Sequence, residues 1–297
     1  MLRRFLHGTV GEHFCQNRLR RSRQVSGNRR GSSLEFVRST VRLAILGAVI
    51  LHACVELILH RPSTRQARAR WLHQLCRRAI HLFGVEVRLH GSFPERGILI
   101  ANHLSYLDIM VFASLSPCVF ISKVEVESWP VIGWMTTMAG TVYVTRGRGG
   151  SAREAGTGMR SAADAHLPVI LFPEGTTTNG DTILRFHSGL LGEALKAEQP
   201  VTPAYLRYSL TEDNGPSRAS DAVAFWGEQP MFPHVFRFLA LRGVRADVTI
   251  ASEPLRFTSP NLPRKLAAVE ARQAICDLHA EACAASPAPS QTVGEAV

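Results

Sequence analysis

Between residues 85 and 255 the chain alternates short apolar runs with stretches in which apolar residues recur every three or four positions. The first pattern is typical of buried strands, and the second of helices that pack one face on a core. Strands are expected at residues 85–89, 97–101, 118–122, 141–144, 167–172, 201–206 and 246–250, and helices at 109–115, 151–165, 190–197 and 262–283. Alternation of this kind predicts an α/β fold with a mixed, mainly parallel sheet flanked by helices.

A longer apolar stretch, residues 43–59, precedes this region. Its 17 residues are interrupted only by His52 and Glu56 and fall just short of the ~20 residues that span a bilayer. A glutamate centred in lipid would cost up to ~3 kcal/mol, so we expect a helix that lies in the membrane or passes marginally through it. The alternative is a buried hairpin helix of a soluble protein. A signal peptide fits poorly, because Arg61-Pro62 follows without a small-residue cleavage site.

Two further apolar patterns suit contact with lipid. Apolar residues from Trp71 to Phe83 recur at helical spacing with arginines around them, which is typical of a helix at a bilayer surface. The same pattern equally suits a helix that packs on the domain and presents its arginines to solvent. Aromatic residues at 225–226 and 231–236 form a second patch, for which loop packing is the alternative.

Positive charge is concentrated at the N-terminus. Residues 1–42 hold ten arginines against Glu12 and Glu35, and they carry +8 of the net charge of +10. Basic tails bind nucleic acid or anionic membranes, and the apolar stretch that follows favours the membrane over a specific nucleic acid. The expected organisation is a basic disordered tail at 1–33, membrane-contact helices at 34–84, the α/β domain at 85–285 and a disordered tail at 286–297.

His103 and Asp108 are the first candidates for chemistry. They follow the predicted strand 97–101, and a histidine oriented by a carboxylate is the minimum equipment for removing a proton from a hydroxyl group. Ser105 and Asp108 have the spacing of a helix capping box, which would place both candidates at the carboxyl end of a strand. The alternative is structural: Asp108 only caps the helix, worth about 0.5–2 kcal/mol, and His103 is an ordinary loop histidine.

A second polar turn follows the predicted strand 167–172. It begins Pro173-Glu174-Gly175-Thr176, and Glu174 lies 71 positions after His103. Pro and Gly around a glutamate fix the backbone and let a ligand approach closely, and hydroxyl groups beside a carboxylate suit a polyol or head group. A surface turn rich in Thr, Asn and Gly, without any such role, is the alternative.

With two others, these runs resemble the four ordered blocks of the glycerolipid acyltransferases, the membrane enzymes similar to 1-acylglycerol-3-phosphate acyltransferase. The resemblance covers about residues 85–255, and its blocks are Asn102-His103-x4-Asp108, residues 140–146, Phe172-Pro173-Glu174-Gly175-Thr176 and residues 201–205.

The resemblance implies a role for each matching residue. His103 would be the general base, and Asp108 would orient it and stabilise the imidazolium. Arg146 would lie near the phosphate of the acceptor, and residues 201–205 would line or support the site. The residues implied to bind the acceptor are Asn102, Arg146, Glu174, Gly175 and Thr176.

The reaction implied needs no metal and no organic cofactor. Acyl-CoA or acyl carrier protein would bring an already activated thioester as co-substrate. The missing component is then a base that works near pH 7, which is the chemistry of histidine. The six cysteines lie outside both runs and lack metal-ligand spacing, so we expect direct attack by the acceptor without a covalent enzyme intermediate.

One position departs from the family pattern. Many members that form phosphatidic acid carry Arg directly after Glu-Gly-Thr, whereas this chain has Thr177; Arg146, Arg148 or Arg185 could supply the charge instead. The expected acceptor is 1-acylglycerol-3-phosphate or a related lysophospholipid, with lyso-ornithine lipid as the alternative. The expected location is the cytoplasmic face of the inner membrane. A hypothesis of another class is a non-catalytic basic protein that binds membrane or nucleic acid through residues 1–42.

Overall fold

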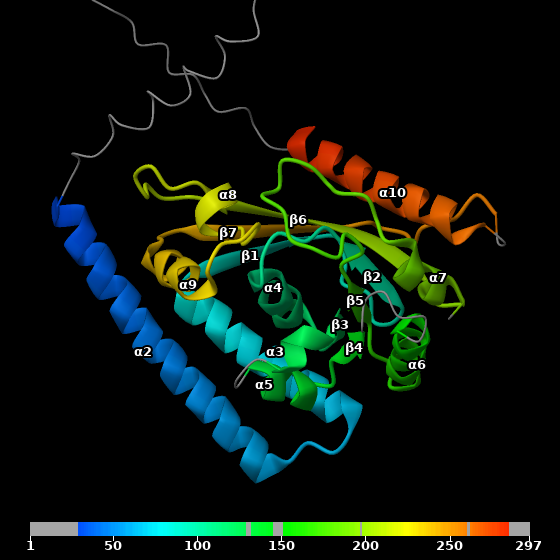
Figure 1. The fold of residues 1–297 in the computed structure, drawn as a ribbon, viewed down its shortest axis with the longest axis horizontal. Coiled ribbons are helices and arrows are strands. Elements are labelled where there is room, and N and C mark those ends of the chain that lie inside the picture. The colour runs from blue at the N-terminus through cyan, green and yellow to red at the C-terminus, as the bar shows by residue number, and fades with distance from the viewer. Residues whose placement is uncertain (1–28, 129–131, 145–150, 197, 260–261, 285–297) are drawn as a thin grey trace, which may run out of the picture.

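A seven-stranded sheet forms the centre of the computed structural model (Figure 1), which describes residues 29–128, 132–144, 151–196, 198–259 and 262–284. The strand order is β1-β7-β6-β2-β5-β3-β4. Neighbouring strands are parallel except β6 and β7, which are antiparallel, and this confirms the mixed, mainly parallel sheet. The strands are β1 (Val85–His90), β2 (Ile98–Ala101), β3 (Val119–Lys123), β4 (Val142–Val144), β5 (Val169–Leu171), β6 (Val201–Leu210) and β7 (Val244–Ile250).

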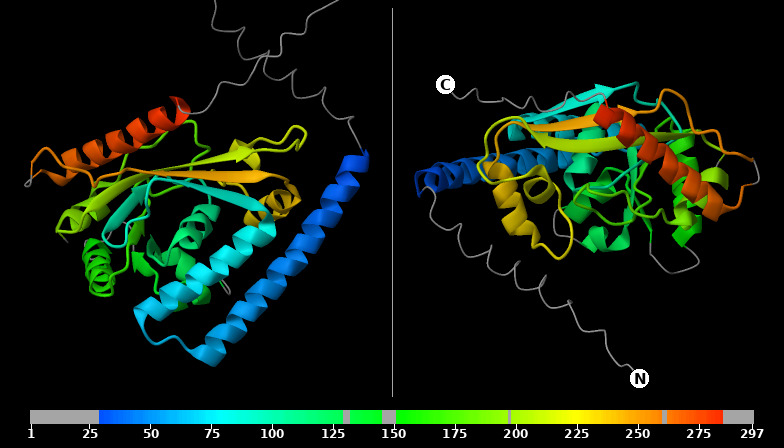
Figure 2. Two further views of the ribbon diagram at one scale, coloured as in Figure 1. Left: turned by 180° about the vertical axis from the view of Figure 1, so that it is seen from behind. Right: turned by 90° about the horizontal axis from the view of Figure 1, so that it is seen from above.

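Helices cover both faces of the sheet (Figures 1 and 2). Leu99 and Ala101 of β2 pack into one core, and Ile98 and Ile100 pack into the other. Burial on both faces explains why the central strands are continuous apolar runs. The helices that cover the first core are α3 (Arg65–Phe83), α4 (Leu107–Leu115), α8 (Ala219–Ala222) and α9 (Met231–Ala240). The helices that cover the second core are α6 (Ser151–Asp164), α7 (Ser188–Lys196) and α10 (Arg264–Ala284). Two short helices, η1 (Val124–Ser128) and α5 (Ile132–Met138), connect β3 to β4.

The long helix α2 (Arg29–His60) runs along one side of the domain (Figure 2). Residues 29–33, which the sequence assigned to the disordered tail, are therefore helical, whereas the rest of that tail and residues 286–297 lie outside the described residues. Near its N-terminal end, Arg38 donates to the Ala240 carbonyl at 2.6 Å and Arg42 donates to the Leu241 carbonyl at 2.7 Å. These carbonyls end α9, where cations are favoured.

The arginine-flanked stripe of α3 is buried. Trp71 and Leu75 pack with Ala53 and Leu57 of α2 in a small separate core, and Phe83 joins the main core. Of the two readings offered by the sequence, packing on the domain is therefore confirmed. The aromatic patch near α9 is divided, because Phe232 is 87% exposed whereas His234 is fully buried.

Candidate active site

His103 lies on the turn between β2 and α4. The strand ends there because the side chain of Asn102 replaces the sheet pairing: its Nδ2 donates to the Leu206 carbonyl at 2.9 Å, and its Oδ1 accepts from the Leu206 N–H at 2.7 Å. Asn102 is buried and both groups of its amide are bound to the backbone of β6. It therefore fixes the turn that carries His103.

His103 and Asp108 form a hydrogen-bonded pair. Nδ1 of His103 lies 2.7 Å from Oδ2 of Asp108, and the same oxygen accepts from the backbone N–H of Leu104 at 2.6 Å and of Ser105 at 3.0 Å. A carboxylate bound by so many donors acts as an acceptor only, so Nδ1 carries a proton and Nε2 has a free lone pair. This is the tautomer that a general base requires.

The capping box predicted for Ser105 and Asp108 is half formed. Asp108 binds the Ser105 N–H, but the Ser105 hydroxyl is buried and has no partner among the described residues, and α4 begins only at Leu107. Asp108 therefore does more than cap a helix, because one oxygen of its carboxylate holds both the turn and the histidine ring. The structural alternative is insufficient to explain this geometry.

The ring of Phe172 and the limited exposure to solvent define the surroundings of the His103–Asp108 pair. The His103 ring stacks on Phe172 with centroids 4.1 Å apart and an interplanar angle of 12°. The His103 side chain is 18% exposed, whereas Asp108 is fully buried. The imidazole is therefore held in one orientation and still reached by solvent.

Glu174 is the residue whose surroundings differ most from expectation. It is only 2% exposed, its Oε1 accepts from the His103 N–H at 2.9 Å, and its Oε2 accepts from the Leu184 N–H at 2.7 Å. Burial raises the pKa of this carboxyl, and the two backbone hydrogen bonds partly oppose that shift. Both oxygens are bound to the protein, so Glu174 joins the histidine turn to the segment around Leu184.

The rest of the second turn supports the same link. Thr178 donates its backbone N–H to the His103 carbonyl at 2.9 Å, and Gly175 has a φ of 72°, a conformation that glycine adopts without strain. Thr176 is exposed, and its side chain is therefore accessible to a ligand. Arg146 lies outside the described residues.

Sequence reasoning missed Tyr208. Its hydroxyl donates to Oδ1 of Asp108 at 2.9 Å, so both carboxylate oxygens are bound. The strand was predicted to end at 206, whereas β6 continues to Leu210. Buried positions Ala204, Leu206 and Tyr208 alternate along one face, and this alternation was the available signal. Within the described residues, no group of three or more His, Cys, Asp or Glu side chains is arranged to hold a metal ion.

Comparison with known proteins identifies the class. A protein-family model described as Acyltransferase matches residues 84–207, a span that contains His103, Asp108 and Glu174. A lyso-ornithine lipid O-acyltransferase of Pseudomonas aeruginosa is 36% identical over 221 residues, which cover 72% of this chain and 78% of that protein. A 1-acyl-sn-glycerol-3-phosphate acyltransferase of Neisseria gonorrhoeae is 34% identical over 126 residues, or 42% of this chain and 49% of that protein.

A solved structure shares the fold. The crystal structure of the 1-acyl-sn-glycerophosphate acyltransferase of Thermotoga maritima aligns with a TM-score of 0.57 at 18% identity, covering 83% of this chain and 97% of that chain. The chain belongs to the glycerolipid acyltransferase family. It is an acyltransferase of lipid biosynthesis, and the hypothesis of a non-catalytic basic protein is wrong.

Proposed function

We propose that the protein is a membrane-associated O-acyltransferase that moves a fatty acyl group from a thioester, acyl-CoA or acyl carrier protein, to the hydroxyl of a lyso-lipid. The observation that carries the proposal is the His103–Asp108 pair, with Nδ1 bound at 2.7 Å and Nε2 left as the basic atom. Asn102 and Glu174 hold the backbone on either side of this pair.

The reaction follows from that arrangement. Nε2 of His103 takes the proton of the acceptor hydroxyl as the oxygen attacks the thioester carbonyl carbon, and Asp108 stabilises the imidazolium. The tetrahedral oxyanion then collapses, the carbon–sulfur bond breaks, and the imidazolium returns its proton to the departing thiolate. An ester and a free thiol result, and His103 regains its starting state.

We further propose lyso-ornithine lipid as the acceptor. Proteins named lyso-ornithine lipid O-acyltransferase from Pseudomonas aeruginosa and Rhizobium meliloti match this chain at 36% and 33% identity. Thr177 stands where many phosphatidic-acid-forming members of the family carry Arg, and Thr176, Thr178 and Asn179 surround it. An ornithine lipid has no phosphate and needs no such cation, so the hydroxyl-rich turn suits it better than 1-acylglycerol-3-phosphate.

The contact with the membrane is proposed to be α2 lying in the plane of the bilayer surface. The helix is about 48 Å long, and the domain contacts it from Phe36, whose ring centroid lies 5.6 Å from that of Phe236, to Leu57. A helix held in this way along the domain cannot cross a bilayer core of about 30 Å. Among the described residues, α2 is the one helix long and apolar enough to cross a membrane by length and composition. Only 11% of its apolar window is buried against the domain, so most of that window is free to contact lipid.

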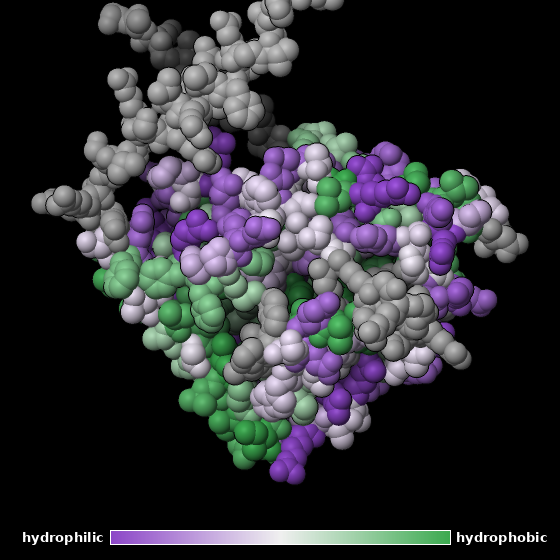
Figure 3. All heavy atoms as spheres, viewed as in Figure 1, coloured by the Kyte–Doolittle hydropathy of each residue, from purple (hydrophilic) through white to green (hydrophobic). Residues whose placement is uncertain are grey.

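The free face of α2 supports this placement. Large apolar side chains are exposed along most of its length, and Figure 3 shows green side chains along the lower left edge, where Figure 1 places α2. Such a one-sided apolar face is typical of helices that lie in the interface. The arginine-rich segment before it favours the cytoplasmic face, where the thioester donors are made. The exposed apolar residues of α2 are Leu34, Phe36, Val37, Val41, Leu43, Leu51, Val55, Ile58 and Leu59.

The test is acyl transfer by the purified protein in neutral detergent micelles. Lyso-ornithine lipid and 1-acylglycerol-3-phosphate are supplied in turn, each with acyl-CoA and with acyl carrier protein. We expect transfer to lyso-ornithine lipid with a kcat/KM clearly above that for the phosphate-bearing acceptor. Transfer to 1-acylglycerol-3-phosphate alone would contradict the proposed acceptor, and transfer to neither lipid would contradict the proposed function.

A further inference from the structure

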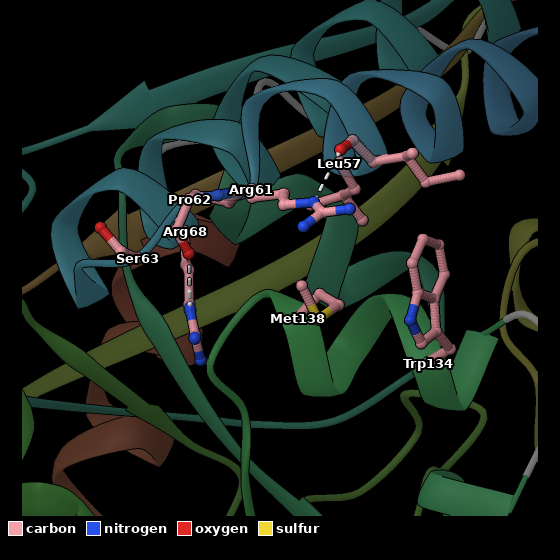
Figure 4. A pocket seen from close by; sticks show the side chains of 8 residues that line it. Leu57, Arg61, Pro62, Ser63, Arg68, Trp134 and Met138 are labelled. Carbon is pink, nitrogen blue, oxygen red and sulfur yellow. Dashed lines mark hydrogen bonds between the residues drawn. The ribbon is translucent and has the colours of Figure 1, made fainter.

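A cleft of about 360 Å³ opens at the turn between α2 and α3, on the side of α5 (Figure 4). It is separate from the proposed active site, because none of its lining residues belongs to the turns that carry His103 and Glu174. Within the part of the chain that the structure describes, the lining combines apolar side chains with two arginines and contains no acidic residue. The lining residues are Leu57, Ile58, Arg61, Pro62, Ser63, Arg68, Trp134 and Met138.

The two arginines are held in place through one nitrogen each. Nε of Arg61 donates to the Ile58 carbonyl at 3.3 Å, and Nε of Arg68 donates to the Pro62 carbonyl at 3.1 Å. These hydrogen bonds fix the side chains, and among the described residues no acceptor binds the terminal guanidinium nitrogens, which are left for a ligand. Figure 4 shows the Arg61 guanidinium above Met138 on the side of Trp134, with Arg68 along the other side of the cleft.

Apolar surface adjoins these charges. Ile58 is 58% exposed, Leu59 is 72% exposed, and Trp134 is 41% exposed. A ligand that fits must therefore carry a negative group for the arginines and an apolar part for the neighbouring side chains. Tryptophan beside arginine is also the composition of protein surfaces at the level of lipid head groups.

We propose that this cleft binds the phosphate group of an anionic phospholipid of the bilayer. Guanidinium groups bind phosphate oxygens through paired hydrogen bonds, and the acyl chains of the lipid would lie along Ile58 and Leu59 with the membrane. The inference rests on the proposed membrane contact of α2. It adds a lipid site at the C-terminal end of that helix, distinct from the site of the acceptor.

The experiment measures binding of the full chain to phosphatidylcholine vesicles with and without phosphatidylglycerol. The wild type should bind the phosphatidylglycerol vesicles more tightly. The double variant Arg61→Gln/Arg68→Gln should lose about fivefold in affinity per arginine for these vesicles and keep its affinity for neutral ones. The matched control is Arg70→Gln/Arg77→Gln, which removes two exposed charges of α3 outside the cleft.

Several outcomes would overturn the proposal. Equal losses in the two double variants, both with the melting temperature of the wild type, would mean general attraction of positive charge to the membrane. Displacement from vesicles by glycerol 3-phosphate would mean a soluble phosphate ligand.

Trp134 gives a second measurement that does not depend on the arginine variants. The fluorescence of Trp134 is obtained by subtracting the emission spectrum of Trp134→Phe from that of the wild type. It should be quenched more by phosphatidylglycerol with brominated acyl chains than by brominated phosphatidylcholine, and equal quenching would contradict the site.

Failure of the site and failure of the proposed function are distinguishable. Acyl transfer is measured in neutral detergent micelles, which contain no anionic phospholipid. If the wild type transfers no acyl group there, the proposed function is contradicted, whereas the lipid site is still judged by the preference for phosphatidylglycerol vesicles. Transfer there, together with no preference for phosphatidylglycerol vesicles, contradicts the lipid site alone.

Discussion

The hydroxyl of Tyr208 donates a hydrogen bond of 2.9 Å to Oδ1 of Asp108, whose other oxygen lies 2.7 Å from Nδ1 of His103. Burial raises the pKa of Tyr208 well above its usual range, so the hydroxyl keeps its proton and remains a donor. A residue 100 positions along the chain therefore fixes the carboxylate that orients the histidine.

Replacing Tyr208 by Phe should lower kcat/KM by about 10- to 100-fold, because a hydrogen bond to a charged group is worth about 1.5–3 kcal/mol and about 1.36 kcal/mol is tenfold in rate. The loss should be in kcat, with KM for the acceptor unchanged, since the hydroxyl acts through Asp108. Tyr205→Phe is the matched control: Tyr205 lies on the same strand and packs in the opposite core. Equal activity of the two variants would show that Tyr208 does not position the pair.

Glu174→Gln distinguishes a structural role of Glu174, in which it holds the turn of His103, from the acceptor-binding role implied by the resemblance. A glutamine can accept from one of the two backbone N–H groups and must point its own N–H₂ at the other. We expect a loss of about 1–3 kcal/mol in the free energy of unfolding and a lower kcat, because the turn that holds His103 loosens. Glu253→Gln, at an exposed position, is the control. A raised KM for the acceptor with unchanged kcat would instead indicate the substrate-binding role implied by the resemblance.

The same carboxyl predicts a pH dependence of stability. Since burial raises the pKa of Glu174 above its usual value of 4.5, the native state holds this proton more tightly than the unfolded chain does. The contribution of Glu174 to stability is therefore full below pH 4.5 and decreases as pH rises through the raised native value. The difference in free energy of unfolding between the wild type and Glu174→Gln should be larger at acid pH than at neutral pH. A difference that grows towards neutral pH would contradict the raised pKa.

The in-plane placement of α2 predicts the effect of charges on its free face. Leu51→Glu/Val55→Glu should weaken binding to neutral vesicles by about tenfold or more per side chain, because burial of such a side chain is worth about 1.5–3 kcal/mol. Leu266→Glu/Val269→Glu places the same charges at exposed apolar positions of α10, on another side of the domain. Equal release of both variants from sedimented vesicles would show that α2 is not the specific contact.

The strands and the main helices follow from the apolar pattern, because both faces of the sheet are buried at its centre and the central strands therefore appear as apolar runs, whereas β1 and β7 alternate apolar and polar residues. The sequence also placed His103 on the turn after a central strand and Asp108 at the start of the following helix, where the structure has them. These features depend on residues close in the chain, and local periodicity is sufficient to predict them.

Features that depend on strand order were not predictable in this way. The Tyr208–Asp108 bond requires β6 to lie beside β2, and the end of β6 was placed too early because polar Arg207 and Ser209 interrupt its apolar run. The inward orientation of Glu174 was missed for a similar reason. A glutamate in a turn rich in threonine normally faces solvent, and only the backbone N–H groups of His103 and Leu184 account for its burial.

The most direct test of the proposed mechanism is the rate of acyl transfer to lyso-ornithine lipid by His103→Ala, measured beside the wild type in neutral detergent. His187→Ala, at an exposed position of the neighbouring loop, serves as the histidine control. If His103 is the base, its removal should lower kcat by about 10²–10⁴-fold at an unchanged melting temperature, whereas the control keeps the wild-type rate. A folded His103→Ala protein that transfers the acyl group within threefold of the wild-type rate would contradict the account.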